Sequence, residues 1–246
     1  MLTYLIIGSV GGLLSGILGI GGGVVFVPLL TYFTKSNFKT NTGVSSLAVV
    51  LVATASSITY LLNGFNEGAN LFLEIFIIIL GGILGGYVGS KLTSKINTKI
   101  LKKMFSLLLI ASAYRMIFTS SVISVYEDNF FLFFIIGFVS GIASGLLGIG
   151  GGIIRIPLLI FFGGFEQIVA QGISLITTVP TAFTAALTKI RADSQLIKIG
   201  LTVGFFGVIG SIVGANLVFS ISSDILNIVF GGFLFLVAIN MFYSTK

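Results

Sequence analysis

The chain of 246 residues has no cysteine and no histidine, and only 8% of its residues are charged. Disulfide bonds, thiol chemistry, haem ligation and a Cys/His metal site are therefore excluded, and we expect no cofactor. Soluble domains carry about a quarter charged residues, so this charge content argues against a soluble protein. The chain also lacks a pair of acids at membrane depth that could act as acid and base, so we do not expect an enzyme.

Apolar residues, in contrast, make up 56% of the chain, and its mean hydropathy is +1.17. Six apolar stretches have about the 20 residues needed to cross a bilayer core. They are 43–63, 70–90, 104–120, 169–188, 199–219 and 225–243. The sequence predicts an all-α integral membrane protein with one transmembrane domain, 1–246, in the cell membrane of a prokaryote. The net charge of +6 lies mainly in short loops, where it sets topology, so no nucleic-acid partner is expected.

A sequence motif of sixteen residues occurs twice, at residues 15–30 and 144–159, and is called the repeated phrase below. Eleven of the sixteen positions are identical and four exchange one aliphatic residue for another. The remaining position differs in kind, because Phe26 in the first copy corresponds to Arg155 in the second. Further matches at the same offset of 129, and from Gly82 onward at an offset of 125 that pairs Gly82 with Gly207, indicate two repeats, 1–122 and 123–246, that together account for the whole chain.

The segments that carry the phrase, 2–34 and 130–163, do not fit simple crossings. As one helix, residues 2–34 would be about 50 Å long, which is too long for a single crossing. Divided at Gly19–Gly23, the segment gives arms of about 15 and 12 residues, which are short for two crossings. We therefore predict that each repeat begins with a Gly-tipped broken or re-entrant helical hairpin, followed by three transmembrane helices.

The charges in the loops favour this arrangement. With both hairpins returning to their own side, one face has Asp193 as its only acid, and the other has acids but no basic loop residue. The positive-inside rule makes the basic face, with both termini, cytoplasmic. Three crossings per repeat is an odd number, so the two repeats are predicted to be inverted. The basic face carries Lys35, Lys39, Lys91, Lys95, Lys99, Lys102, Lys103, Lys189, Arg191, Lys198 and Lys246.

The two glycine tips are expected to meet near the midplane, where secondary transporters commonly bind substrate. Helix starts expose backbone N–H groups and a positive dipole end, and glycine lets a small anion approach closely. Arg155 lies three residues after the second tip, and an arginine at membrane depth faces a cavity or a partner, or else extends to the interface. The candidate substrate-binding residues are Gly21, Gly22, Gly23, Gly150, Gly151, Gly152, Arg155, Ser45, Gln171 and Ser174.

Two further sets of glycines have small-xxx-small spacing, which predicts close packing of helices and not ligand contact. These sets are Gly81, Gly82, Gly85, Gly86 and Gly89, and Gly200, Gly204, Gly207, Gly210 and Gly214.

The doubled phrase Ser-Gly-(Ile/Leu)-Leu-Gly-Ile-Gly-Gly-Gly, followed by an aliphatic run and Pro-Leu-Leu, resembles the TauE/SafE sulfite-exporter family. The resemblance covers almost the whole chain. It implies a membrane transporter of small anions, with sulfite, organosulfonates and related sulfur oxyanions as the usual substrates.

We expect a secondary transporter that moves a small sulfur-containing anion by alternating access. The alternatives are a passive anion channel and a membrane enzyme or scaffold. The partners expected are the small anion and membrane lipids. A proton or sodium ion for coupling, a homodimer, and the direction of transport all stay open.

Overall fold

A computed structural model describes residues 1–34, 36, 38–65, 71–92, 98–118, 129–190 and 195–243. Within these ranges every regular element is an α-helix, as predicted. The helices are α1 (Leu2–Leu18), α2 (Gly23–Thr34), α3 (Phe38–Leu62), α4 (Phe72–Leu92), α5 (Thr98–Phe118), α6 (Phe130–Leu147), α7 (Gly152–Gly163), α8 (Gln167–Ile190), α9 (Gln195–Val218) and α10 (Ser223–Tyr243).

Six of the described helices are long and apolar enough to cross a membrane. They are Thr40–Leu62, Phe72–Leu92, Phe130–Leu147, Gln167–Ile190, Leu196–Val218 and Ser223–Asn240. Five agree with stretches expected from the sequence. The sixth, Phe130–Leu147, has 18 residues and is the first arm of the second hairpin, which was not among the expected crossings. The expected span 104–120 falls in α5, Thr98–Phe118, which begins six residues earlier with turns that carry lysines and is not among these six.

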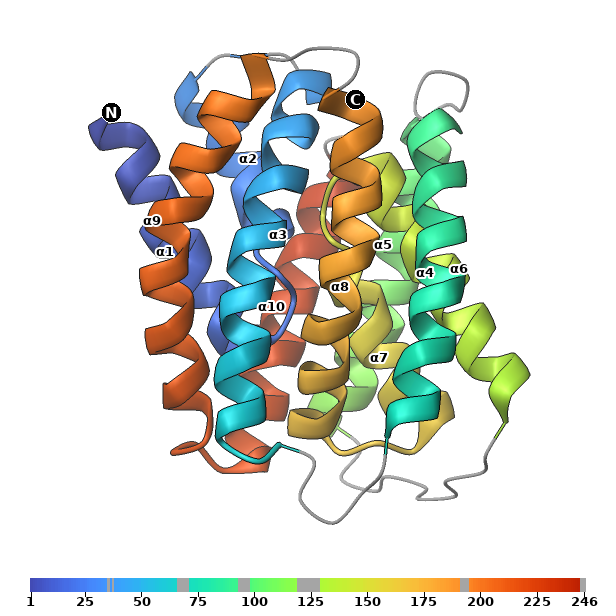
Figure 1. The fold of residues 1–246 in the computed structure, drawn as a ribbon. Helices are drawn as coiled ribbons and strands as arrows, with labels where there is room; N and C mark the ends of the chain where they lie inside the picture. The colour runs from blue at the N-terminus through green and yellow to red at the C-terminus, as the bar shows by residue number, and fades with distance from the viewer. Residues whose placement is uncertain are drawn as a thin grey trace.

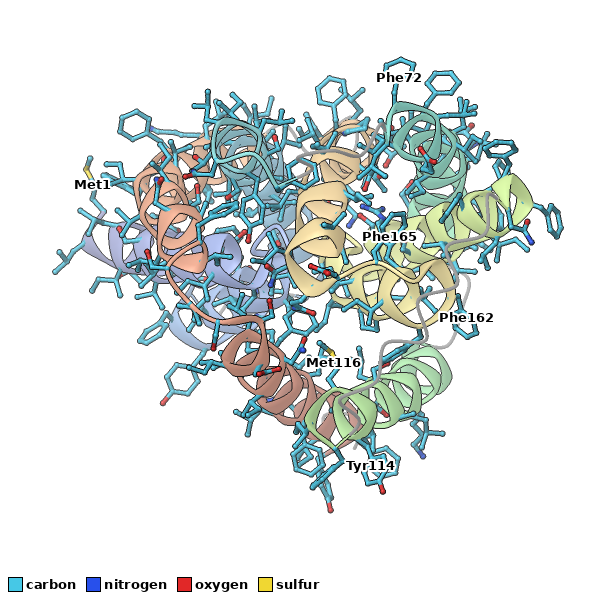
Figure 2. The ribbon with its side chains drawn as sticks, turned by 90° about the horizontal axis from the view of Figure 1, so that it is seen from below. Met1, Phe72, Tyr114, Met116, Phe162 and Phe165 are labelled. Atoms are coloured by element: carbon cyan, nitrogen blue, oxygen red, sulfur yellow. The ribbon has the colours of Figure 1, made fainter. Side chains whose placement is uncertain are left out.

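The outer surface of the bundle is apolar, as a lipid-facing surface should be. Phe72 is 76% exposed and Tyr114 is 66% exposed, whereas Met116 on the same helix as Tyr114 is only 7% exposed. Figure 2 shows that Met116 points toward the rest of the bundle and Tyr114 away from it. In that view α5 and α10 form a pair along one side, and the other helices surround the centre.

The helices that carry the repeated phrase run in opposite directions in the two halves of the chain. In Figure 1, α1 starts at the upper end of the bundle and α2 returns to that end, whereas α6 starts at the lower end and α7 returns there. The helices α3 and α8, which follow them, run through the full height of the bundle. The turns between α1 and α2 and between α6 and α7 therefore lie inside it.

Glycines allow two pairs of helices to pack at backbone contact. A methyl group on Gly85 of α4 would collide with the carbonyl oxygen of Phe138 on α6, and one on Gly12 of α1 with that of Gly207 on α9. The predicted close packing is confirmed. The α4 glycines that face α6 are Gly81, Gly85 and Gly89, while Gly82 and Gly86 face α8; Gly210 and Gly214 of α9 face α1, while Gly200, Gly204 and Gly207 face α3.

Candidate functional site

The repeated glycines form the same sharp turn in both halves of the chain. After α1, Gly21 and Gly22 have φ angles of 78° and 83°; after α6, Gly150 and Gly151 have φ angles of 81° and 79°. These angles lie in the left-handed region, which glycine adopts without a steric penalty. The turns end where α2 begins at Gly23 and α7 begins at Gly152. We call these two turns tip 1 (19–23) and tip 2 (148–152).

The two tips lie side by side. A Cβ atom on Gly23 would be 2.5 Å from the Cα of Ile149, and one on Gly152 would be 2.8 Å from the Cα of Ile20. The structure thus brings together the six tip glycines that the sequence singles out. It also places the N-terminal ends of α2 and α7 next to each other, where helix dipoles favour negative charge.

Ser45 and Ser174 each hold the tip that belongs to the other half of the chain. The hydroxyl of Ser45 donates to the carbonyl oxygen of Gly148 at 2.9 Å, and the hydroxyl of Ser174 donates to that of Gly19 at 3.0 Å. Both serines are fully buried. Their donors are engaged in these bonds, so in this conformation they position the tips.

Gln171 forms hydrogen bonds next to tip 1, with the end of α1 and with Tyr60. Its Nε2 donates to the carbonyl oxygen of Ile17 at 3.3 Å, and its Oε1 accepts a hydrogen bond from the hydroxyl of Tyr60 at 3.1 Å. The same hydroxyl lies 3.1 Å from the carbonyl oxygen of Gly16. Tyr60 is not among the residues that the sequence predicts for the site.

Among the described residues Arg155 is the largest fully buried side chain, with an exposure of 0%. Its Nε donates to the hydroxyl of Ser140 at 3.0 Å. Its Nη1 lies 2.7 Å from the hydroxyl of Thr177, 3.1 Å from that of Thr178 and 3.2 Å from the carbonyl oxygen of Ser174. Among the described residues these partners are all neutral. The same part of the chain has no cluster of acidic side chains that could hold a metal ion.

The remaining nitrogen of Arg155, Nη2, has no hydrogen-bond partner in the described part of the chain. It faces two glycines: a Cβ atom would lie 3.4 Å from Nη2 if built on Gly151 and 3.6 Å away if built on Gly82. A guanidinium has five N–H donors, and leaving donors buried without a partner is costly. An anion beside Nη2 would satisfy them.

The equivalent position in the first half of the chain is apolar. The ring of Phe26 lies against tip 1 and α9, with its Cε2 2.7 Å from a Cβ built on Gly22 and its Cζ 3.5 Å from one built on Gly207. Gly22 and Gly207 correspond to Gly151 and Gly82 in the repeat. Phe26 and Arg155 therefore occupy equivalent sites of opposite character.

The residues around these two sites differ in the same sense. At the offset of 129, the hydroxyls that surround Arg155 replace residues that cannot accept a side-chain hydrogen bond. Ser140 replaces Gly11, Thr177 replaces Ala48, and Thr178 replaces Val49. Ser140 is not among the site residues expected from the sequence, and the spacing of Gly82 predicts only helix packing. Comparison of the two copies shows that Ser140 stands where the first copy has Gly11, but not that Ser140 lies beside Arg155.

The family model of the sulfite exporter TauE/SafE matches residues 1–116 and 133–246. The chain belongs to the TauE/SafE family. The resemblance that the doubled phrase suggested is thereby confirmed. Together with the six apolar helices, membership of this family makes the chain an integral, multi-pass membrane protein.

Curated relatives of this TauE/SafE chain carry matching names. It is 35% identical over 162 residues to "Probable membrane transporter protein MJ0441" of Methanocaldococcus jannaschii, which covers 63% of this chain and 60% of the relative. It is 36% identical over 108 residues to "Probable membrane transporter protein YdhB" of Bacillus subtilis, 44% of each chain. The match to "Probable membrane transporter protein YunE" of Bacillus subtilis is 27% identical over 125 residues, 48% and 46% of the two chains. The matches thus span about half the length of these relatives.

Proposed function

We propose that this protein is a secondary membrane transporter of a small sulfur-containing anion of the sulfite and organosulfonate class. The anion binds between the two tips, next to Arg155. The observation that carries the proposal is the buried Nη2 of Arg155, which has no partner among the described residues and lies between Gly82 and Gly151. A sulfite or sulfonate group offers several oxygens that can accept from a guanidinium in a charge-assisted hydrogen bond.

The two halves are inverted repeats in this proposal, each starting with a re-entrant hairpin. Reciprocal contacts support the symmetry: Ser45 bonds the carbonyl of Gly148, and Ser174, its equivalent, bonds that of Gly19. The opposite directions of the two hairpins in Figure 1 support the inversion. Alternating access would then expose the tips first to one face and then to the other.

The end of the bundle at which α1 begins is cytoplasmic in this proposal, because the basic loop residues gather there by sequence. The described part of that end includes Lys91 and Lys198, in the last turn of α4 and the first turns of α9. The residues of the charge argument that lie outside the described ranges are Lys35, Glu67, Lys95, Glu127, Asp128, Arg191, Asp193 and Lys246.

A passive anion channel is the alternative. The complete burial of Arg155, Ser45 and Ser174 supports a carrier, because an open pore would leave its anion site accessible to water. A current across planar bilayers that exceeds carrier turnover would favour the channel. The coupling ion, a homodimer and the direction of transport stay open.

Replacing Arg155 tests the site. Purified protein would be screened by thermal shift with sulfite, thiosulfate, sulfoacetate, taurine and sulfate, and uptake of labelled sulfite would be measured in vesicles. We expect the Arg155→Gln variant to bind the stabilising anion about tenfold more weakly or worse, because it loses a charge-assisted hydrogen bond. The matched control is Lys198→Gln, which removes an exposed charge in the first turns of α9. Unchanged binding and uptake in Arg155→Gln would remove Arg155 from the site.

A further inference from the structure

The helix α8 carries a polar face next to tip 1. Gln171, Ser174, Thr178 and Thr181 follow one another at intervals of three and four residues, which places them on one side of the helix. All four are fully buried, and three of them contact a tip or Arg155. Lys189 lies on the same side of α8, eleven residues after Thr178, in the last turn of the helix; Ala182 and Ala185 lie between it and Thr181.

Lys189 reaches back toward tip 2. Its Nζ donates to the hydroxyl of Ser46 at 3.3 Å, and Ser46 is itself buried. The preceding residue, Ser45, donates to the carbonyl of Gly148 in tip 2. The ammonium group therefore lies close to the residues that hold this tip. An ammonium has three donors, and the Ser46 hydroxyl is its hydrogen-bond partner within the described residues.

On the other side of the tips, the residue equivalent to Lys189 is neutral. Tyr60 is the repeat equivalent of Lys189, at the offset of 129. It is fully buried, and its hydroxyl lies within hydrogen-bond distance of the Gly16 carbonyl and Gln171. Its ring packs edge-on against Phe219 and Phe65, with centroids 5.2 Å and 6.4 Å away. A neutral aromatic cluster therefore lies near the end of α3, whereas the cation of Lys189 lies near the end of α8.

We propose that Lys189 is a second anion-binding residue, which receives the anion from Arg155 on the side of the tips where α8 ends. This inference rests on the proposed function. The anion would pass the hydroxyls of α8 up to Thr181 and then meet a second positive charge at Lys189, whereas the equivalent position on the other side is the neutral Tyr60. A lysine in the last turn of a helix also interacts favourably with the helix dipole. That role does not depend on anions, so its loss would affect transport from both faces equally.

The test compares Lys189→Gln with Lys198→Gln, both lysines near the same end of the bundle. Sulfite affinity would be measured on purified protein, and labelled sulfite uptake in everted and right-side-out vesicles. Everted vesicles present the face at which α8 is proposed to end. We expect the half-saturating sulfite concentration of Lys189→Gln to rise about tenfold in everted vesicles, as for loss of one charge-assisted hydrogen bond, and to stay within about twofold in right-side-out vesicles. Lys198→Gln should match the wild type.

Each other result has a definite meaning. If Lys189→Gln behaves like Lys198→Gln in both vesicle types while Arg155→Gln loses binding, the role of Lys189 is overturned and the proposed function stands. An equal effect from both faces overturns the one-sided placement of the second site. A wild-type protein that neither binds nor transports sulfite, thiosulfate, sulfoacetate, taurine or sulfate overturns both proposals.

Discussion

At the scale of single residues, the two equivalent sites at the tips show what a buried arginine requires. Arg155 is surrounded by the hydroxyls of Ser140, Thr177 and Thr178, which leave only Nη2 without a partner in the described part of the chain. At the Phe26 site these acceptors are absent, because glycine, alanine and valine stand in their places. Arginine is therefore compatible with one site and not with the other.

Exchanging Phe26 should expose this difference. The Phe26→Arg variant would bury a guanidinium without acceptors, which costs several kcal/mol, and we expect poor folding or a strongly lowered melting temperature in detergent. Phe26→Leu is the matched control, because it leaves a smaller apolar side chain and creates only a cavity. Equal melting temperatures for the two variants would show that the hydroxyls around Arg155 are not what makes its burial tolerable.

The candidate site could be predicted in part from the sequence. The duplicated glycines identified the tips, and the exchange of Phe26 for Arg155 identified the cation. Both are seen directly when residues 15–30 and 144–159 are aligned. Ser140 and Gly82 could not be identified in the same way. They approach Arg155 only because α6 and α4 pack at a particular register, and that register is set by three-dimensional contacts between distant segments.

At the scale of helices, glycine positions decide how closely α4 and α6 approach. We expect Gly85→Ala to lower the melting temperature markedly, because the added methyl group would collide with the backbone of α6 at Phe138. Gly232→Ala in α10 is the control, since a Cβ there meets nothing within 4 Å and alanine is the better helix former. Thermal unfolding in the same detergent compares them. A Gly85→Ala protein as stable as Gly232→Ala would contradict backbone contact between α4 and α6.

Helix positions were easier to predict than helix ends. Hydropathy located five of the six candidate spans, since an apolar run of about 20 residues has few other structures available in a membrane. Over the expected span 104–120 the structure has α5, Thr98–Phe118, which begins six residues earlier and includes Lys99, Lys102 and Lys103. Composition alone does not show where a helix continues through charged residues.

At the scale of the whole molecule, the closest helix packing runs between the two halves of the chain. The α4 helix of the first half packs along α6 of the second, and α9 of the second half packs along α1 of the first. The tips are likewise held by serines of the opposite half. Neither half therefore completes its own hairpin environment, which favours the prediction of one transmembrane domain over 1–246.

The orientation of the two halves is the prediction that most needs a direct measurement. The chain has no cysteine, so single-cysteine variants at Lys39, Lys198, Glu67 and Asp128 each report one position to a membrane-impermeant thiol reagent. Inverted repeats with re-entrant hairpins require Lys39 and Lys198 to react from the cytoplasmic face, and Glu67 and Asp128 from the other. If the hairpins were single crossings, each half would cross the membrane four times and the two halves would have the same orientation. Lys39 and Lys198 would then react from opposite faces, and the inverted repeat would have to be abandoned.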